Sequence, residues 1–401
     1  MPGPMHGVKV VEMGVWIAGP AAGGILADWG ADVIKIEPPG IGDPARSFQS
    51  MFGTELPFNP IFENDNRSKR SIVLDLGNET GRALALELID EADVFVTNVR
   101  MKALERLGLD PDSLRARNPR LVYAAISGYG FEGPDADRAA YDIAAFWARS
   151  GIAASLTTPG SHPPFQRGGM GDHNAGLAAA AAVSAALYSR EKTGEGQLVS
   201  TSLLREGIYT LSFDLSLGAR LGVPVAVADR KTMGNPCINN YADKDGRWFW
   251  IVGLEAERHW PPLCRAVGHP EWIDDPRFAT AAERALHAGE IIAELDAIFA
   301  TKTRAEWTEV FDTETDLWWS PVQSTEEVLA DPQVLAAGGL VEVPDGPGTT
   351  LLPATPVDFE GTPWAPRCMA PGHGEHSDEI LRELGRSDEE IQGLRERAVV
   401  A

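Results

Sequence analysis

Residues 8–37 read VKVVEMGVWIAGPAAGGILADWGADVIKIE: two short apolar runs separated by a run rich in alanine and glycine. The apolar runs at 8–12 and 33–37 have the length of buried strands. Residues 19–29 predict a helix between them, because Pro20 stands in its first turn, where a missing N–H costs nothing, and Gly30 follows its end. The stretch therefore predicts a strand–helix–strand unit at the start of a parallel sheet.

The same alternation continues to about residue 200. Apolar runs predict strands at 71–75, 94–97 and 121–127, and amphipathic runs predict helices at 78–90, 102–107 and 112–117. Strands that alternate with helices are typical of an α/β fold with a Rossmann-like parallel sheet. Because ligands of such sheets bind at the carboxyl ends of the strands, a site is expected in the loops that follow them.

The rest of the chain predicts a second, smaller domain, since 401 residues exceed the usual size of one hydrophobic core. We expect residues 1–200 to form the first part of the large domain and a helix at 203–221 to lie in a linker at 201–225. Residues 226–325 predict a small α+β domain, with a hairpin turn at Asp245-Gly246 and helices at 260–268, 281–299 and 304–312. Residues 326–401 have no obvious core, so they are expected to return to the large domain and build it from both chain ends.

Composition and charge exclude several classes of partner. A net charge of −23 argues against nucleic acid and anionic membranes, which both need basic surface. No signal peptide is indicated, and no apolar run reaches the roughly 18 residues of a membrane span. The turn at 14–19 lacks the Gly-x-Gly-x-x-Gly pattern of dinucleotide sites, which disfavours NAD. The chain has three cysteines, Cys237, Cys264 and Cys368. They are too few and too scattered for a disulfide framework or a zinc site, which favours a cytoplasmic setting.

A glycine-rich stretch later in the chain presents a single carboxylate. It reads Gln166-Arg-Gly-Gly-Met-Gly-Asp-His-Asn-Ala-Gly176 and runs into an almost wholly apolar segment at 177–188, which predicts a buried helix. Aspartate is an ordinary helix N-cap, so capping is one interpretation of Asp172. A reactive carboxylate is the other, because glycines let a substrate approach the backbone closely.

Nine short patterns occur in order along nearly the whole chain, and together they resemble the family III CoA-transferases. They are Ala18-Gly-Pro20; Gly30-Ala-Asp-Val-Ile-Lys-Ile-Glu37 with Gly42-Asp43; Lys69-Arg-Ser-Ile72 with Leu74-Asp75; Ala92-Asp-Val94 with Asn98; Ser127-Gly-Tyr-Gly130; Gly171-Asp172; Lys192-Thr-Gly-Glu-Gly-Gln197; Pro321-Val-Gln323; and Gly374-Glu-His-Ser-Asp-Glu379. The resemblance implies a large Rossmann-like domain, a small domain and a homodimer of interlocked protomers.

In that family the position of Asp172 is the nucleophile. An aspartate with a pKa of about 3.9 is ionised at neutral pH and needs no general base. The resemblance implies that it moves CoA from an acyl-CoA donor to a free organic acid through an aspartyl anhydride and an aspartyl–CoA thioester. Because one thioester replaces another, no ATP, metal or tightly bound cofactor is expected, and coenzyme A enters as acyl-CoA substrate.

The family also contains α-methylacyl-CoA racemases, which add a histidine to this aspartate. The matching segment is Arg138-Ala-Ala-Tyr-Asp-Ile143, where Tyr141 or its neighbour stands in place of the histidine. Tyrosine, with a pKa of about 10, is a poor base near neutrality, which disfavours a racemase or epimerase. His173 is disfavoured as the missing base, because neighbouring residues on a helix point apart. A catalytically silent acyl-CoA-binding protein stays as a third alternative.

Further site residues follow from the resemblance. Trp16, Ile17 and Ala18 are expected on the loop that approaches CoA, and three more residues match CoA-contacting positions: Lys69, Asn98 and Arg106. Arg46 and Arg138 are lesser candidates, and Pro38 replaces a basic residue of formyl-CoA transferase. Backbone N–H groups at Gly169 and Gly171 are candidate donors to a developing oxyanion, and Tyr141 is a candidate substrate contact. The segment 231–235 lacks the glycine run that formyl-CoA transferase closes over its aspartate.

Overall fold

The computed structural model describes residues 3–48, 56–223, 225, 227 and 229–401. Contacts divide the chain into two compact units. The large unit comprises Met1–Leu156, Pro163–Val225 and Ala336–Ala401, and the small unit comprises Thr157–His162 and Ala226–Leu335. The small unit thus includes ten residues beyond the predicted end at 325, and the predicted start at 226 lies outside the described residues.

A six-stranded sheet with every pair parallel forms the centre of the large unit. Its order, β3-β2-β1-β4-β5-β6, is that of a doubly wound fold. The strands are β1 (Lys9–Met13), β2 (Asp32–Glu37), β3 (Arg70–Val73), β4 (Val94–Thr97), β5 (Val122–Ser127) and β6 (Leu198–Ser202). The predicted α/β fold with a Rossmann-like parallel sheet is therefore confirmed.

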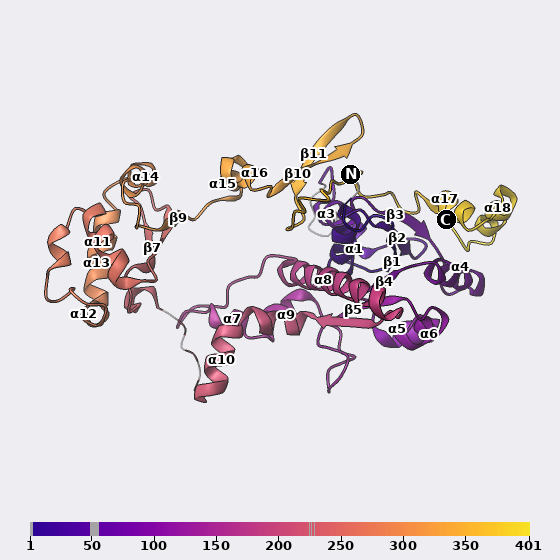
Figure 1. The fold of residues 1–401 in the computed structure, drawn as a ribbon, viewed down its shortest axis with the longest axis horizontal. Coiled ribbons are helices and arrows are strands. Elements are labelled where there is room, and N and C mark those ends of the chain that lie inside the picture. The colour runs from indigo at the N-terminus through magenta and orange to yellow at the C-terminus, as the bar shows by residue number, and fades with distance from the viewer. Residues whose placement is uncertain (1–2, 49–55, 224, 226, 228) are drawn as a thin grey trace. The chain divides into compact units, whose positions relative to one another are not determined.

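Helices cover both faces of this sheet (Figure 1). One face packs against α1 (Ala18–Asp28), α7 (Ile152–Ser155), α8 (Met170–Thr193), the start of α9 (Leu203–Thr210) and the π-helical turn Ile143–Ala148. The other packs against α4 (Glu79–Asp90), α5 (Met101–Leu107), α6 (Pro111–Arg117), α17 (Ser377–Glu383) and α18 (Asp388–Glu396). Alternate strand residues supply the two cores, Val10 to one and Val11 to the other, as the two-residue period of a strand requires.

The two chain ends meet in the large unit, but the parallel strands all come from its first part. The C-terminal segment adds α17, α18 and an isolated antiparallel bridge between Leu74 and Val400. It also carries the hairpin of β10 (Leu340–Asp345) and β11 (Gly348–Pro353), which pairs outside the main sheet. The large unit is thus built from both chain ends, as expected, and the strands of its parallel sheet all come from the N-terminal part.

Several predicted helix bounds also change. The helix expected at 203–221 is two helices, α9 and α10 (Ser212–Leu221), because Leu211 leaves the helical conformation between them. The one expected at 281–299 breaks at His287 into α12 (Ala281–Leu286) and α13 (Ala288–Phe299). Among the elements not predicted are strand β6 and α3 (Pro60–Asn66), which Asn59 caps by accepting a hydrogen bond from the Phe62 N–H. Short 3₁₀ turns lie at Pro44–Ser47, Arg230–Thr232 and Pro270–Ile273.

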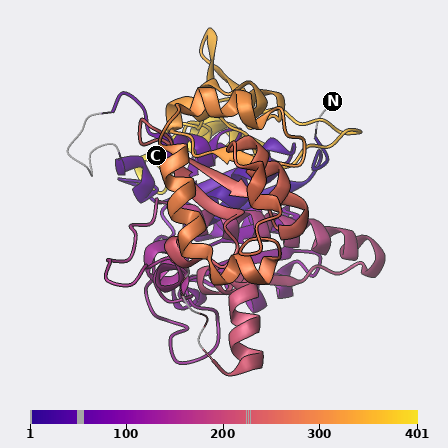
Figure 2. The same ribbon diagram turned by 90° about the vertical axis from the view of Figure 1, so that its left-hand side faces the viewer.

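The small unit has an antiparallel sheet and its own apolar core. Its helices and strands are drawn in red to orange in Figure 2. Its strands are β7 (Ile238–Ala242), β8 (Trp248–Val252) and β9 (Trp319–Pro321). Packed around them are α11 (Ala256–Ala266), α12, α13 and α14 (Arg304–Phe311), followed by α15 (Thr325–Ala330) and α16 (Pro332–Ala336). In neither unit does a helix of the described residues combine the length and apolar character needed to cross a membrane.

Candidate active site

The glycine-rich stretch ends in the first turn of α8. Gly169 is the N-cap, with φ of 82°, a left-handed conformation that favours glycine. Asp172 is therefore the third residue of the helix, and its interpretation as the N-cap is wrong. At this position its half-buried carboxylate lies in the positive field of the helix N-terminus, which favours an anion.

A second carboxylate, Asp142, lies against the same turn. Asp142 Oδ2 accepts a hydrogen bond of 3.0 Å from the Gly171 N–H. A Cβ on Gly171 would overlap both Asp142 and Phe146, so only glycine permits this approach. The Gly171 N–H is occupied by this bond, which corrects its expected role as an oxyanion donor. The unbonded N–H groups in the turn stay candidates for that role.

The two aspartates change each other's chemistry. Burial, together with the neighbouring Asp142 charge, raises the pKa of Asp172 to about 7, while the nearby His173 lowers it by a smaller amount. Asp142 is 7 % exposed, and its Oδ1 has no hydrogen-bond partner among the described residues. The assumption that Asp172 is an ordinary aspartate, fully ionised at neutral pH, is therefore corrected. Half of the Asp172 carboxyls in the free enzyme are protonated at about pH 7.

The loop after β1 is fixed on both sides of Trp16. Asn98, which follows β4, accepts a hydrogen bond from the Val15 N–H at 2.9 Å and donates one to the Val15 carbonyl at 2.8 Å. Asp43 Oδ1 accepts from the Trp16 N–H at 2.9 Å. These bonds hold Trp16 at a φ of 62°, which a residue with a bulky side chain adopts only when its surroundings impose it.

Aromatic and apolar contacts join this loop to the two aspartates. The Trp16 ring meets the Tyr141 ring edge-on, with centroids 6.0 Å apart, and Tyr141 directly precedes Asp142. On the other side, a Cβ on Gly169 would lie 3.4 Å from Ile17 Cδ1. Asn98, the loop at Trp16 and Ile17, Tyr141, and the turn that holds Gly169 and Asp172 are thus neighbours at the carboxyl ends of β1, β4 and β5.

Comparison with known proteins agrees with this arrangement. The family model described as CoA-transferase family III matches residues 5–377. This chain belongs to CoA-transferase family III. It is 33% identical over 400 residues to (R)-2-hydroxy-4-methylpentanoate CoA-transferase of Clostridioides difficile, covering 99% of each chain. It is 34% identical to cinnamoyl-CoA:phenyllactate CoA-transferase of Clostridium sporogenes, covering 97% of this chain and 95% of that one.

The solved structures agree. A CAIB/BAIF family protein from Brucella suis is 30% identical, with a TM-score of 0.83 over 96% of this chain and all of that one. Like its relatives, the chain is an enzyme of the family III acyl-CoA:carboxylate CoA-transferase type. CoA thioesters are therefore its class of substrate.

Lys69 of this CoA-transferase lies in the interior. It is 1 % exposed, and its Nζ bonds to Glu12 Oε2 at 2.5 Å, the Pro20 carbonyl at 2.8 Å and Asn66 Oδ1 at 2.9 Å. Three internal acceptors use all three of its donors. Lys69 therefore departs from the expected phosphate contact, and equally from the solvated surface position that is commonest for lysine.

The candidate arginines lie in three different environments. Arg46 binds Glu37 through two hydrogen bonds of 2.7 Å and stacks on Phe62, so its guanidinium is occupied within the protein. Arg138 is exposed, with a 3.7 Å ion pair to Asp135. Arg106 is exposed on α5, just after β4, and pairs with no acidic side chain among the described residues. Ile17 and Ala18 are buried side chains, so a ligand would meet their backbone.

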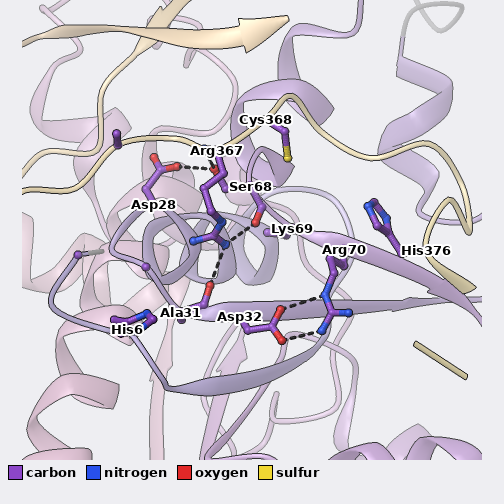
Figure 3. A pocket seen from close by; sticks show the side chains of 13 residues that line it. His6, Asp28, Ala31, Asp32, Ser68, Lys69, Arg70, Arg367, Cys368 and His376 are labelled. Atoms are coloured by element: carbon purple, nitrogen blue, oxygen red, sulfur yellow. Dashed lines mark hydrogen bonds and ion pairs between the residues drawn. The ribbon is translucent and has the colours of Figure 1, made fainter. Parts of the chain in front are cut away.

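A different cavity, of about 510 Å³, lies at the opposite edge of the sheet, where β2 and β3 begin (Figure 3). Its cations are engaged: Arg70 pairs with Asp32, and Arg367 donates to the Ala31 and Ser68 carbonyls. None of the site residues around Asp172 lines this cavity. Lys69 lines it, but its ammonium binds Glu12 in the interior. Nowhere in the described ranges do three His, Cys, Asp or Glu side chains form a group that could hold a metal ion.

Sequence reasoning missed two features of the site. Asp142 is 30 positions from Asp172, and no sequence motif indicated that its carboxylate would meet the glycine turn. The second is an ion pair between His173 Nε2 and Asp65 Oδ1 at 3.0 Å, which joins α8 to α3. The position of Asp142 directly after Tyr141 was the one available signal, because that segment matches the place of the racemase histidine.

Proposed function

We propose that this enzyme moves CoA from an acyl-CoA donor to a free carboxylic acid through covalent intermediates on Asp172. The position of Asp172 carries the proposal: a half-buried carboxylate in the first turn of α8, beside Asp142 and a glycine turn. A pKa of about 7 leaves a large ionised fraction at neutral pH. A carboxylate with a raised pKa is also the stronger nucleophile, so the site favours attack by Asp172.

The proposed steps balance without a metal or an external acid. The Asp172 carboxylate attacks the donor thioester carbonyl, the C–S bond breaks, and CoA leaves as a thiolate while an aspartyl anhydride forms. The thiolate then attacks the Asp172 side-chain carbonyl and displaces the donor acid as its carboxylate. An acceptor carboxylate attacks the resulting aspartyl–CoA thioester, the C–S bond breaks, and CoA leaves as a thiolate while a second anhydride forms. The thiolate finally attacks the acceptor carbonyl of this anhydride, which releases the new acyl-CoA and frees the Asp172 carboxylate.

The CoA moiety is proposed to lie along the loop at Trp16 and Ile17, which Asn98 and Asp43 hold in place. Arg106 is the proposed phosphate partner, because it is exposed after β4 and unpaired among the described side chains. Arg138, whose ion pair with Asp135 is long, is a second candidate. Arg46 has the weakest claim, since Glu37 occupies its guanidinium.

The proposed acceptor is a 2-hydroxy acid with a branched or aromatic side chain. Two relatives that match nearly the full length are named for such acids, (R)-2-hydroxy-4-methylpentanoate and phenyllactate. The Trp16–Tyr141 pair supplies aromatic surface next to the aspartates, and Tyr141 is 65 % exposed. Aromatic faces of this kind bind planar and branched apolar groups well.

The functional molecule is proposed to be a homodimer. Helix α10 has no buried residue, and apolar side chains spaced four apart form a stripe that continues from α9: Tyr209, Phe213, Leu217 and Leu221. Their exposed fractions of 78, 75, 37 and 66 % are high for large apolar residues. A contiguous apolar face of this kind marks an interaction surface. Light scattering coupled to size-exclusion chromatography would test it, and a monomer of 43.2 kDa would contradict it.

Covalent trapping tests the mechanism. The enzyme is incubated with an acyl-CoA and hydroxylamine, which converts an aspartyl anhydride or thioester to a hydroxamate, and the modified residue is mapped by mass spectrometry. Modification at Asp172, and a loss of activity on the order of 10³-fold or more in Asp172→Asn, are expected. Asp137→Asn, an exposed aspartate on the loop before Tyr141, is the matched control. Modification elsewhere, or an active Asp172→Asn, would contradict the mechanism.

Substrate identity and the alternatives are tested by product mass. Acyl-CoA donors are paired with 2-hydroxy acids, dicarboxylates and fatty acids, and turnover of a branched or aromatic 2-hydroxy acid is expected to be the fastest. The same reactions run in deuterium oxide test the racemase alternative, since deuterium at the α-carbon without an acceptor would support it. Acyl-CoA that stays unchanged with every acid, together with no label on Asp172, would favour the silent binding protein.

A further inference from the structure

His173 follows Asp172 on α8, and its ring is held by a carboxylate from a different helix. His173 Nε2 lies 3.0 Å from Asp65 Oδ1, on α3. Asp65 is 3 % exposed; its Oδ1 also accepts from the Asn64 amide at 3.0 Å, and its Oδ2 has no hydrogen-bond partner among the described residues. A buried carboxylate with one unpartnered oxygen favours a protonated imidazole beside it. Although burial lowers the pKa of His173, the hydrogen bond and charge of Asp65 raise it above the ordinary value overall.

The opposite side of the imidazole ring faces the glycine turn. A Cβ on Gly169 would lie 3.0 Å from His173 Cε1 and 3.1 Å from Nδ1, so the ring is packed on the N-cap of the helix that carries Asp172. The side chain is 50% exposed and lines a pocket of about 520 Å³ between α1, α3, α8 and residues 353–356. Solvent protons therefore reach the ring, although Asp65 fixes its orientation.

The charges around His173 are mostly negative. Asp65 faces it from α3, Asp172 is its neighbour on α8, and Asp142 lies beyond Asp172. The Lys69 ammonium, from the residue just before β3, interacts with Asp65. Arg67 also lines the pocket, but it is paired with Asp28 at 2.8 Å, and α1 and residues 353–356 bring no charged side chain to it. The imidazolium is thus the cation between the Asp65 carboxylate and the two aspartates of the site.

The geometry points to His173, oriented by Asp65, as a positioning residue that keeps Asp172 ionised against the repulsion of Asp142. This role rests on the proposed function, in which Asp172 attacks as a carboxylate. It is not the role of a proton-transferring base, because Asp65 occupies Nε2 and the ring atoms around Nδ1 pack on Gly169. The Asp65–His173 pair thereby sets the pH above which Asp172 is a carboxylate.

A shift of the pH profile follows from this arrangement. Activity rises as Asp172 ionises and then stays level, because Asp172 is a carboxylate at every higher pH whether or not His173 is charged. In His173→Gln the loss of the cation moves the rising limb to higher pH by roughly half to one unit. In Asp65→Asn the imidazole loses its carboxylate partner, so the pKa of His173 falls.

The test measures kcat/KM from pH 5.5 to 9.5 for the full-length enzyme and both variants. The matched control is His269→Gln, which removes another histidine–carboxylate pair, with Glu271 at 2.8 Å, in the small unit. Its profile is expected to match that of the unmodified enzyme. ¹³C NMR of histidine-labelled protein, with the His173 signal assigned by its loss in the Gln variant, gives the His173 pKa directly, and a value above 6.5 is expected.

Failure of this inference can be told apart from failure of the proposed function. If acyl-CoA labels Asp172 but His173→Gln leaves the rising limb in place, His173 has only a structural role and the inference is overturned. If Asp172 is not labelled at all, the mechanism itself fails. Should His173→Gln not fold, the NMR measurement decides: a His173 pKa of 6.5 or lower in the folded enzyme would overturn the inference, and a value above 6.5 supports it.

Discussion

Two groups of buried carboxylates lie beside α1 and α8, and they differ in whether each charge has a partner. In the first, Lys35 Nζ binds Glu12 Oε1 at 2.8 Å and Asp43 Oδ2 at 2.9 Å, and Lys69 binds the other oxygen of Glu12. In the second, Asp142 and Asp172 face each other, and the nearest cation, His173, is a titratable one. We call the first group the paired network and the second the aspartate pair.

The pKa shifts of the two groups run in opposite directions. Burial alone would raise the pKa of Glu12, but Lys35 and Lys69 lower it overall, so that carboxylate stays charged. Burial and Asp142 together raise the pKa of Asp172 to about 7. Full pairing holds a structure at every physiological pH, whereas like charges leave a carboxyl ready to react and to titrate. The paired network also supports the site indirectly, because its Asp43 accepts the hydrogen bond from the Trp16 N–H.

Breaking the paired network is expected to have the largest effect on stability. Lys35→Met leaves Asp43 and one oxygen of Glu12 buried without their cation, which costs roughly 3–5 kcal/mol in free energy of unfolding. The matched control is Lys9→Met, whose ion pair with Glu91 is more than half exposed and is worth about 0–1 kcal/mol. Urea unfolding followed by circular dichroism measures both. Equal losses in the two variants would contradict the assigned role of the paired network.

Neutralising Asp172 is expected to stabilise the protein. The folded-state pKa of Asp172, about 7, lies above its unfolded value of 3.8, so its contribution to stability is full below pH 4 and is lost as pH rises through 7. Asp172→Asn removes that loss and is expected to gain on the order of 2 kcal/mol at pH 8 and little near pH 4. Thermal unfolding at both pH values measures the difference. A destabilised variant at pH 8 would show that the aspartate pair is not repulsive.

The contrast between the two groups also explains which features of the structure could be predicted from the sequence. The strand–helix alternation predicted the parallel sheet, because periodicity is a local property. Motifs at Asp172, Asn98 and Trp16 predicted residues that the fold brings together. The burial of Lys69 could not be predicted, because lysine is usually exposed and Glu12, which compensates its buried charge, is a neighbour only in three dimensions. Whether a charge is paired depends on contacts between distant residues, and no single-sequence pattern records them.

For the aspartate pair, the sequence likewise did not predict the pKa of Asp172 or the start of α8. Asp172 was assigned the pKa of a free aspartate, since Asp142 had no visible connection to it in the sequence. The start of α8 was also misplaced: the glycine at 169, with its positive φ, takes the cap position that Asp172 was considered for. Local preference favoured aspartate as a cap, but the close approach of Asp142 and Phe146 to Gly171 fixed the turn instead.

Removing one charge from the aspartate pair is expected to move the pH profile. Asp142→Asn keeps an oxygen that can accept from the Gly171 N–H while it removes the negative charge, so the pKa of Asp172 falls and the rising limb of kcat/KM shifts down by roughly one pH unit. Asp137→Asn, on the same loop but exposed, is the control and should leave the limb in place. A limb that stays near pH 7 in Asp142→Asn would assign the raised pKa to burial alone.

The smallest expected effect comes from Asn98, which holds the loop that carries Val15 and Trp16. Asn98→Ala removes two hydrogen bonds to Val15, worth about 1–2 kcal/mol together, and frees the loop that carries Trp16. The KM for the acyl-CoA donor should rise about 5–10-fold with kcat nearly unchanged, since the proposed role of the loop is to bind CoA and not to react. Asn118→Ala also removes hydrogen bonds that fix a loop, but that loop lies at the amino end of β5. It should lose similar stability without a change in KM. If both variants raise KM equally, the effect is one of general stability, and Asn98 does not position the CoA loop.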